Sequence, residues 1–396
     1  MNKLRSALVC LLALPVLGQA VETDPVGFVT VALTGNSDSY VYIPFKRPPA
    51  FVGIAASLSA NGSYDLGEPF TDTSGDGLWQ AGEPFTDTNN VITLAGTPGF
   101  ATNQFVYVSG SQPNRYYAFL KSGTRAGMYY TVVSNGTDSL VLDTAGDTLS
   151  AAITSDTTLE VIPYDTLGTI FPGGVGVHPS ATHGIGTRQS EIYLPDLSTA
   201  GKNLALTTSY YYFSPANNLN TGWRKAGAAA VLENDAVLPP DSFFVVRHNI
   251  AADTTLTFTG TVQMAPLAAP IGTVVASVDQ DNAVALPFAT EMTLAQLKLY
   301  ESGAFAHSPS HGLGVRQDEL LVYVNGSGGK NKAPDAIYYY FDNGVPATKG
   351  WRRSGVAGTI ADNDVVVGPT KSIVIRKKGT TNPSSVLWSV KPPYVP

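Results

Sequence analysis

The sequence predicts an all-β protein made of two related β-sandwich or small-barrel modules, the first carrying a β-rich insertion with a helix-less EF-hand-like loop. Short runs rich in Val, Phe, Thr and Tyr, such as 28–33 and 243–247, recur along the chain between Asn, Gly, Asp and Pro residues. An Asn-Gly pair at 135–136 is typical of a hairpin. The best helix candidate is one or two turns from Thr293, which matches a capping box with Gln296.

The first residues have the pattern of a secretory signal peptide. Two basic residues precede an apolar run at 7–17, and a small-residue pattern ends at Ala20. We therefore expect residues 1–20 to be removed and the mature chain to be secreted or held at the cell surface. The apolar run is too short to span a membrane, so no membrane insertion is expected. Cys10, the only cysteine, lies in this run, which predicts a mature chain without disulfides.

Composition narrows the classes of function. Without Lys3 and Arg5 the basic residues fall from 24 to 22 against 31 acidic ones, a net charge of −9. An acidic chain without a Lys/Arg cluster argues against nucleic acid and anionic membranes as partners. Charged residues make up only 14% of the chain, and 39 Gly, 27 Pro and 19 Tyr suit a β-rich extracellular protein. No nucleophile or phosphate-binding motif is present, so we expect no enzyme activity.

An internal duplication with an offset of 128 residues organises the chain. Residues 183–191 match 311–319, and 210–213 match 338–341. Over residues 183–213, 14 of 31 positions are identical to the second copy without a gap. Repetition at this level predicts two copies of one structural unit.

The duplication sets the expected boundaries. Module 1 covers residues 21–262 and module 2 covers 263–396. Module 1 also holds an insertion at 46–163, because the second copy has no counterpart to it. The insertion has five apparent strands, at 104–109, 116–121, 128–133, 139–143 and 158–162.

Residues 72–83 of the insertion match the twelve-position pattern of an EF-hand loop. The oxygen ligands expected at positions 1, 3, 5, 7, 9 and 12 are Asp72, Ser74, Asp76, the Leu78 carbonyl, Gln80 through a water, and Glu83. Gly77 falls at position 6, where the chain must turn sharply. This set of hard oxygen donors predicts Ca²⁺ as the bound cofactor. A pair of Asp/Gly turns with no ion is the alternative.

The loop belongs to a tandem array at 57–89. Residues 57–68 repeat the pattern with weaker ligands, and a third start begins at Asp87. We expect Asp87 to lend an oxygen to the ion of the main loop. Pro69 and Pro84 follow the two glutamates and disfavour the flanking helices of an EF-hand.

Two resemblances follow from these residues. The Asp/Asn/Gly-rich array resembles the helix-less calcium loops of dockerin and thrombospondin type 3 repeats. The opening 24–31, the segments 104–110 and 162–171, and the Tyr-Tyr-Tyr and Gly-Trp-Arg blocks resemble an uncharacterised family of secreted bacterial β-rich repeat proteins. The second resemblance covers nearly the whole mature chain and implies secretion and a β-rich fold. It implies no activity.

Four of the five histidines occupy similar places in the two copies: His178, His183, His307 and His311. With the Arg and Glu residues that follow, they could bind Zn²⁺ or act as acid–base groups. Their spacing differs between the copies, and the setting is a Gly/Pro/Ser loop. A duplicated loop held by hydrogen bonds explains the same pattern, and we favour it.

The sequence leaves three functions open. The first is a non-catalytic cell-surface or matrix protein stabilised by calcium, with a polysaccharide or a cell-surface protein as partner. The second is a carbohydrate-binding protein that stacks sugars on the Tyr-Tyr-Tyr strands beside Trp223 or Trp351. Packing of those rings in a core or between the modules is the competing interpretation, and for these rings we favour it. The third is a secreted hydrolase with a dispersed site. The oligomeric state stays open.

Overall fold

The computed structural model describes residues 24–396 except 61, 63, 65–67, 150–152, 197 and 327. The expected signal peptide at 1–20 lies outside the described residues. The described chain is nearly all β, and its one α-helix, α1 (Leu167–Ile170), is a single turn. Short 3-10 turns are η1 (Pro172–Gly174), η2 (Ile185–Thr187), η3 (Ala295–Leu297), η4 (Leu313–Val315) and η5 (Pro346–Thr348). The all-β prediction is confirmed.

Module 1 is built around a five-stranded antiparallel sheet with the order β12-β11-β10-β14-β2. Two smaller sheets, β1-β15 and β13-β9, accompany it. Its strands are β1 (Val26–Leu33), β2 (Asp38–Val41), β9 (Asp165–Thr166), β10 (Ser190–Leu194), β11 (Thr208–Phe213), β12 (Gly222–Lys225), β13 (Val237–Leu238), β14 (Phe244–His248) and β15 (Thr254–Thr261). Inward residues of the large sheet and of β1-β15 form one apolar core, which includes Val31, Trp223 and Phe258.

Module 2 has the same arrangement. Its five-stranded sheet has the order β17-β23-β19-β20-β21, and β16-β24 and β18-β22 are the smaller sheets. Its strands are β16 (Leu267–Gly272), β17 (Gln280–Val284), β18 (Met292–Thr293), β19 (Glu319–Val324), β20 (Ala336–Phe341), β21 (Gly350–Arg353), β22 (Val365–Val367), β23 (Lys371–Lys377) and β24 (Ser385–Val390). Each strand corresponds to one in module 1, so the repeated residues fall at equivalent positions of equivalent sheets.

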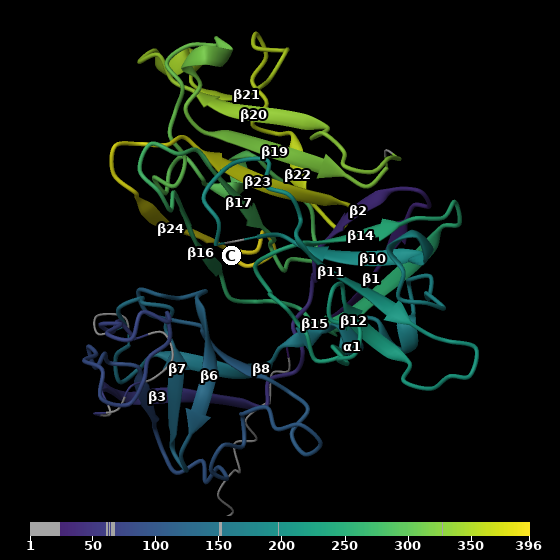
Figure 1. The fold of residues 1–396 in the computed structure, drawn as a ribbon. Coiled ribbons are helices and arrows are strands. Elements are labelled where there is room, and N and C mark those ends of the chain that lie inside the picture. Colours follow the sequence, from purple (N-terminus) through teal and green to yellow (C-terminus); the bar gives the residue numbers. More distant parts are fainter. Residues whose placement is uncertain are drawn as a thin grey trace, which may run out of the picture.

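The insertion is a closed barrel with the strand order β3-β4-β7-β6-β5-β8. Figure 1 shows it as a separate lobe beside the two modules. Its strands are β3 (Phe51–Ser59), β4 (Val91–Leu94), β5 (Tyr116–Leu120), β6 (Tyr129–Asn135), β7 (Ser139–Asp143) and β8 (Thr158–Pro163). Alternate residues of these strands point inward and fill the barrel, as in Ile92, Leu140 and Leu142.

Two local predictions need correction or refinement. The strand expected at 104–109 is wrong: this segment forms turns, with the Gln104 and Val106 amides bonded to carbonyls three residues earlier. Those amides are therefore not free to join a sheet. The helix expected from Thr293 is the single turn η3, and the Thr293 amide donates to Gln296 Oε1 at 2.8 Å.

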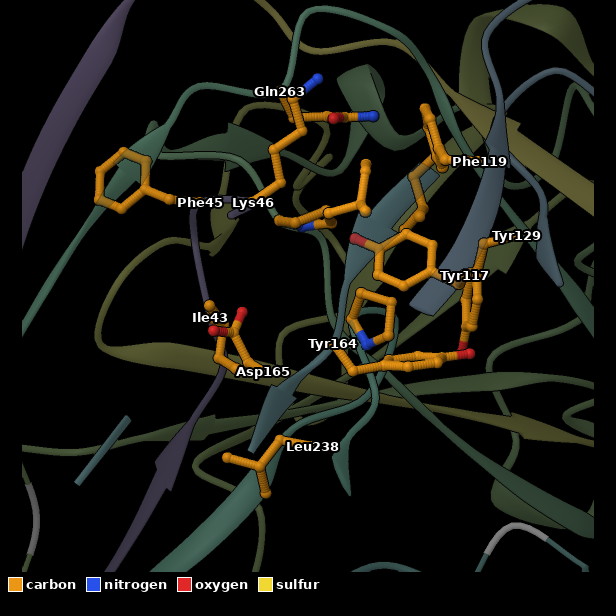
Figure 2. Close-up of a pocket in the computed structure, with 14 residues that line it drawn as sticks. Ile43, Phe45, Lys46, Tyr117, Phe119, Tyr129, Tyr164, Asp165, Leu238 and Gln263 are labelled. Atoms are coloured by element: carbon orange, nitrogen blue, oxygen red, sulfur yellow. The ribbon is translucent and has the colours of Figure 1, made fainter. Parts of the chain in front are cut away.

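The barrel is fixed to module 1 through an aromatic joint. Figure 2 shows Tyr117, Tyr129 and Tyr164 together at this joint, and ring centroids of the Tyr117–Tyr164 pair lie 4.7 Å apart. A cavity of about 20 Å³ remains between these rings and module 1, room for about one water. Beside it, the buried Glu160 carboxylate of β8 pairs with Lys46 and Lys121 at 2.5 and 2.9 Å.

The two large sheets pack face to face. Their contact is an apolar cluster that includes Tyr42 and Val245 from module 1 and Leu321 and Val374 from module 2. Loops with the repeated Gly-Lys-Asn motif also cross between the modules: the Gly329 carbonyl accepts the Asp38 amide, and the Gly201 carbonyl accepts the Asp281 amide, both at 2.9 Å. The duplication therefore produces a two-module unit with reciprocal contacts.

Candidate metal site

The candidate calcium loops lie in the connection from β3 to β4, neighbouring antiparallel strands of the barrel. The two Pro-Phe-Thr copies of this connection pair with each other in antiparallel fashion. The Thr71 amide donates to the Pro84 carbonyl, and the Thr86 amide donates to the Pro69 carbonyl, both at 2.8 Å. Because the motif repeats, the two halves of the connection are related by an approximate twofold arrangement.

An aromatic cluster supports the paired loops. Tyr64 and Trp79 stack with ring centroids 4.5 Å apart and an interplanar angle of 13°. Phe70 and Phe85 meet the Tyr64 ring edge-on, at 5.7 and 5.8 Å. Tyr64 and Trp79 occupy the same position in the two copies of the array. The cluster therefore gives the polar loops a small core of their own.

Asp72 and Asp76 organise the main loop. Asp72 accepts the Gly77 amide on Oδ2 at 2.8 Å and the Gly75 amide on Oδ1 at 2.5 Å. Asp76 accepts the Leu78 amide on Oδ1 at 2.8 Å and the Gln80 Nε2 group on Oδ2 at 2.6 Å. Gly77 has φ of 77°, the left-handed conformation that the predicted turn at position 6 requires.

Glu83 closes the loop rather than facing an open ligand position. Its Oε1 accepts the Thr73 and Ser74 amides at 2.8 and 3.0 Å, together with the Thr73 hydroxyl. Its Oε2 accepts the Gln80 amide at 2.9 Å. Glu83 can therefore offer Oε2 to an ion in this arrangement, but bidentate binding requires the Oε1 hydrogen bonds to open.

Asp87 lies with the other copy of the loop. Its Oδ2 accepts the Gly62 amide at 2.6 Å, as Asp72 accepts the Gly77 amide. The structure thus joins the third start of the array to the first loop. The oxygen that Asp87 is expected to lend to the main-loop ion stays a prediction. The Glu68 carboxylate likewise accepts the amide and hydroxyl of Thr88, at 2.6 and 3.0 Å.

Thr73 and Thr88 are the residues that sequence reasoning missed. Each follows an aspartate and binds the glutamate of one copy: Thr73 contacts Glu83, and Thr88 contacts Glu68. The signal was present, because the hexapeptide Glu-Pro-Phe-Thr-Asp-Thr occurs identically at 68–73 and 83–88. The threonine of each hexapeptide thus binds the glutamate of the other hexapeptide. This exchange depends on the antiparallel pairing of the two hexapeptides, which only the folded chain reveals.

The carboxylates of Asp72, Asp76 and Glu83 are ionised, and no Lys, Arg or His among the described residues pairs with them. Hydrogen bonds from the amides of Gly77 and Gly75 lower the pKa of Asp72, and those of Leu78 and Gln80 lower the pKa values of Asp76 and Glu83, respectively. Residues 48–114 contain no Lys, Arg or His. The donors are hard oxygens suited to Ca²⁺. Within the described residues, however, no three His, Cys, Asp or Glu side chains converge as a metal-binding group.

The repeated histidines hold loops in place. His183 Nδ1 bonds to the Tyr211 hydroxyl at 2.7 Å, and His311 Nδ1 bonds to the Tyr339 hydroxyl at 2.8 Å. His178 lies elsewhere, with its ring 4.7 Å from that of His248. Neither copy brings its two histidines into a metal-binding group among the described residues, so the favoured loop-holding interpretation agrees with the contacts.

The tryptophans beside the Tyr-Tyr-Tyr strands agree with the core-packing interpretation rather than with sugar stacking. Trp223 and Trp351 are only 1% and 2% exposed, and each packs in the core of its module. Tyr211 and Tyr339 are fully buried on the opposite face, beneath Arg188 and Arg316. The Tyr211 and Tyr339 rings are also held by the histidine-bearing loops, so neither these two rings nor the two tryptophans present an open face to a sugar.

Comparison with known proteins assigns neither a family nor a function to the chain. No protein-family model, curated protein or solved structure matches the chain significantly. The resemblance to secreted bacterial repeat proteins therefore stays a prediction. No helix in the part of the chain that the structure describes is long and apolar enough to cross a membrane.

Proposed function

We propose that the chain is a non-catalytic, exported protein of the cell surface or extracellular matrix whose barrel carries a calcium-binding loop. The observation that carries this proposal is the set of three ionised carboxylates, Asp72, Asp76 and Glu83, within twelve residues of a segment that has no cationic side chain. A divalent cation relieves the mutual repulsion of these groups. The duplicated modules and the barrel then act as a rigid carrier, with a polysaccharide or a cell-surface protein as the partner.

The chain's own residues define what the ion would contact. Asp72, Asp76 and Ser74 supply side-chain oxygens, and the exposed Leu78 contributes its carbonyl. Gln80 can contribute its side-chain oxygen, because its Nε2 group already binds Asp76. A bound Ca²⁺ supplies positive charge and fixes the loop on the aromatic cluster. Extracellular sites of this kind bind with Kd of about 10⁻⁴–10⁻³ M.

The proposal predicts a modest but specific stabilisation. At ten times Kd, calcium adds about 1.4 kcal/mol to the free energy of unfolding. Thermal melting in excess EDTA and in millimolar Ca²⁺ measures this effect. Asp76→Asn should abolish the calcium response, whereas Asp196→Asn, which alters a similarly hydrogen-bonded aspartate outside the loop, should retain it.

Two results would contradict the proposal. Parent protein that melts identically with EDTA and Ca²⁺ would identify the loop as a pair of Asp/Gly turns. A calcium response that survives Asp76→Asn would place the ion elsewhere in the chain. Melting in Mg²⁺ serves as the control for ionic strength, because Mg²⁺ demands a tighter octahedral site.

A further inference from the structure

A cavity of about 640 Å³ opens beside β12 of module 1, within the size range of small-molecule sites. It lies between the loop after β11, the turn at 229–232 and His183. None of its lining residues is acidic, although the whole chain has an excess of acidic residues. Its charged side chain is Arg224.

Arg224 is a buried cation without a counter-ion in the described structure. The residue is 3% exposed and forms no ion pair with any described carboxylate. Its Nη1 donates weakly to the Trp223 carbonyl at 3.4 Å, and its Nη2 donates to the Asn220 carbonyl. Its Nε has no partner among the described residues. A buried guanidinium in this state is costly, and an anion entering the cavity would compensate its charge.

His183 and Phe213 form one wall of the cavity. The His183 ring stacks on Phe213 with centroids 4.0 Å apart. Because Nδ1 is bonded to the Tyr211 hydroxyl, Nε2 is the ring nitrogen left without a described partner. This wall therefore combines a fixed aromatic surface with one polar nitrogen.

The facing loop supplies amides and apolar groups. Asn217 uses Oδ1 to accept the Leu219 amide, which leaves its Nδ2 group available, and the Asn220 side chain has no described hydrogen bond. Leu219 and Leu232 are 65% and 48% exposed and line the same cavity. Free amides suit hydroxyl groups, and exposed aliphatic side chains suit the C–H face of a sugar ring.

We propose that this cavity binds a uronic acid sugar, with the carboxylate directed to Arg224 and the hydroxyl groups to Asn217 and Asn220. A carboxylate matches the unpaired guanidinium, and charge-assisted hydrogen bonds of this kind are the strong ones. A neutral sugar leaves Arg224 without its counter-ion and should bind more weakly. The site is independent of the proposed calcium loop, because no residue belongs to both.

Module 2 provides a matched control inside the same chain. Arg352 is 4% exposed, donates to the Trp351 and Thr348 carbonyls, and lies over Phe341, as Arg224 does over Phe213. The positions equivalent to Asn217 and Asn220 are Val345 and Thr348. The buried arginine is thus common to both modules, whereas asparagines at the positions of Asn217 and Asn220 occur in module 1 and not at the equivalent positions of module 2.

Ligand-observed NMR titration of the full chain with glucuronate tests the proposal, with glucose and acetate as control ligands. Glucuronate should bind, and both controls should bind at least about tenfold more weakly. Arg224→Gln should weaken glucuronate binding by about 10- to 100-fold, and Arg352→Gln should leave it unchanged. Asn217→Ala, at an exposed position, should weaken binding several-fold without affecting folding.

The proposal is overturned if glucuronate does not bind the parent chain at millimolar concentration, or if glucose binds equally well. It is also overturned if Arg352→Gln reduces binding as much as Arg224→Gln. If Arg224→Gln does not fold, the Asn217→Ala variant decides, and unchanged affinity in that variant contradicts the site. Repeating the titration in EDTA separates this result from the fate of the calcium proposal.

Discussion

Arg247 of module 1 donates a hydrogen bond of 2.6 Å to the side-chain oxygen of Asn331 in module 2. The same guanidinium holds the Asp38 carboxylate of its own module with two hydrogen bonds, at 2.6 and 2.8 Å. In the other direction, Arg376 of module 2 donates to Asn203 of module 1 at 2.7 Å. Arg247 and Arg376 each therefore connect an ion pair of their own module to a loop of the other module.

This reciprocity explains why the Gly-Lys-Asn motif occurs twice. The backbone N–H of Asn331 also donates a hydrogen bond to the Asp38 carboxylate, at 2.6 Å, and the backbone N–H of Asn203 donates one to the Asp281 carboxylate, at 2.7 Å. Each asparagine thus contacts both partners of the opposite ion pair. A residue that satisfies two charged groups in the partner module contributes to docking as well as to local structure.

Arg247→Met should strongly destabilise the two-module unit. The substitution leaves the Asp38 carboxylate, which is 2% exposed, without its guanidinium. Loss of one partner of a buried pair costs about 3–5 kcal/mol. Urea unfolding followed by intrinsic fluorescence measures the change. Arg353→Met, at an exposed arginine of β21, is the control and should change stability by less than about 0.5 kcal/mol. A loss below about 1 kcal/mol for Arg247→Met would contradict this role.

Glu83→Gln should loosen the loop around Trp79. A neutral amide cannot reproduce the carboxylate that accepts the amides of Thr73, Ser74 and Gln80. Because the other tryptophans are buried in the module cores, a red shift of emission reports on Trp79. We expect that shift in EDTA, without loss of the cooperative unfolding of the modules. Glu291→Gln, at an exposed glutamate, should leave the emission unchanged. An unshifted spectrum for Glu83→Gln would mean that the glutamate does not close the loop.

Asp165 should make the protein less stable as pH rises from about 4 to 6. Burial raises the pKa of Asp165 to about 6, although the Arg47 guanidinium opposes this shift. The folded chain then binds more protons than the unfolded chain between the two pKa values, so ionisation above that window costs up to about 3 kcal/mol. Asp165→Asn should raise stability at pH 7 and change it little at pH 3.5. Chemical denaturation at both pH values measures this, and equal effects at the two would contradict it.

His248 should make the protein less stable as pH falls, which is opposite to the effect of Asp165. Its ring is fully buried between the Ser190 and Thr254 hydroxyls, and burial lowers its pKa to about 4, with the neighbouring His178 adding to the shift and Asp253 opposing it. The unfolded chain binds more protons between about 4 and 6.5, so stability falls as pH falls through that window.

His248→Gln tests this prediction. Glutamine can bond to the same hydroxyls but does not titrate, so the variant should lose the part of the acid destabilisation that His248 causes, about 3 kcal/mol at full protonation. The readout is the difference in free energy of unfolding between pH 7 and pH 4.5. A parent-like difference in the variant would contradict it. Because Asp165 changes stability in the opposite sense over nearly the same pH range, the two effects partly cancel in the parent, and each single variant should show a steeper pH profile than the double variant.

Local patterns accounted for much of the architecture. The spacing of apolar and turn residues predicted the all-β class, because strand formation depends on a period of two that is visible in the sequence. The duplication, whose 128-residue offset slips by one residue near its end, placed Arg247 and Arg376 on matching strands, β14 and β23. The turn at Gly77 also followed from its position in the twelve-residue pattern. Errors arose where local turns competed with pairing, as at 104–109.

The sequence by itself determined the all-β class and indicated the duplicated segments and the residues that carry loop chemistry, since these depend on neighbours along the chain. Only the tertiary structure decided that Asp87 meets Gly62, that Trp223 is buried, and that Asn331 binds Arg247. Each of these contacts joins residues distant in sequence. Their partners depend on how sheets pair and pack, and a pattern of local periodicity holds no information about which surface will cover another.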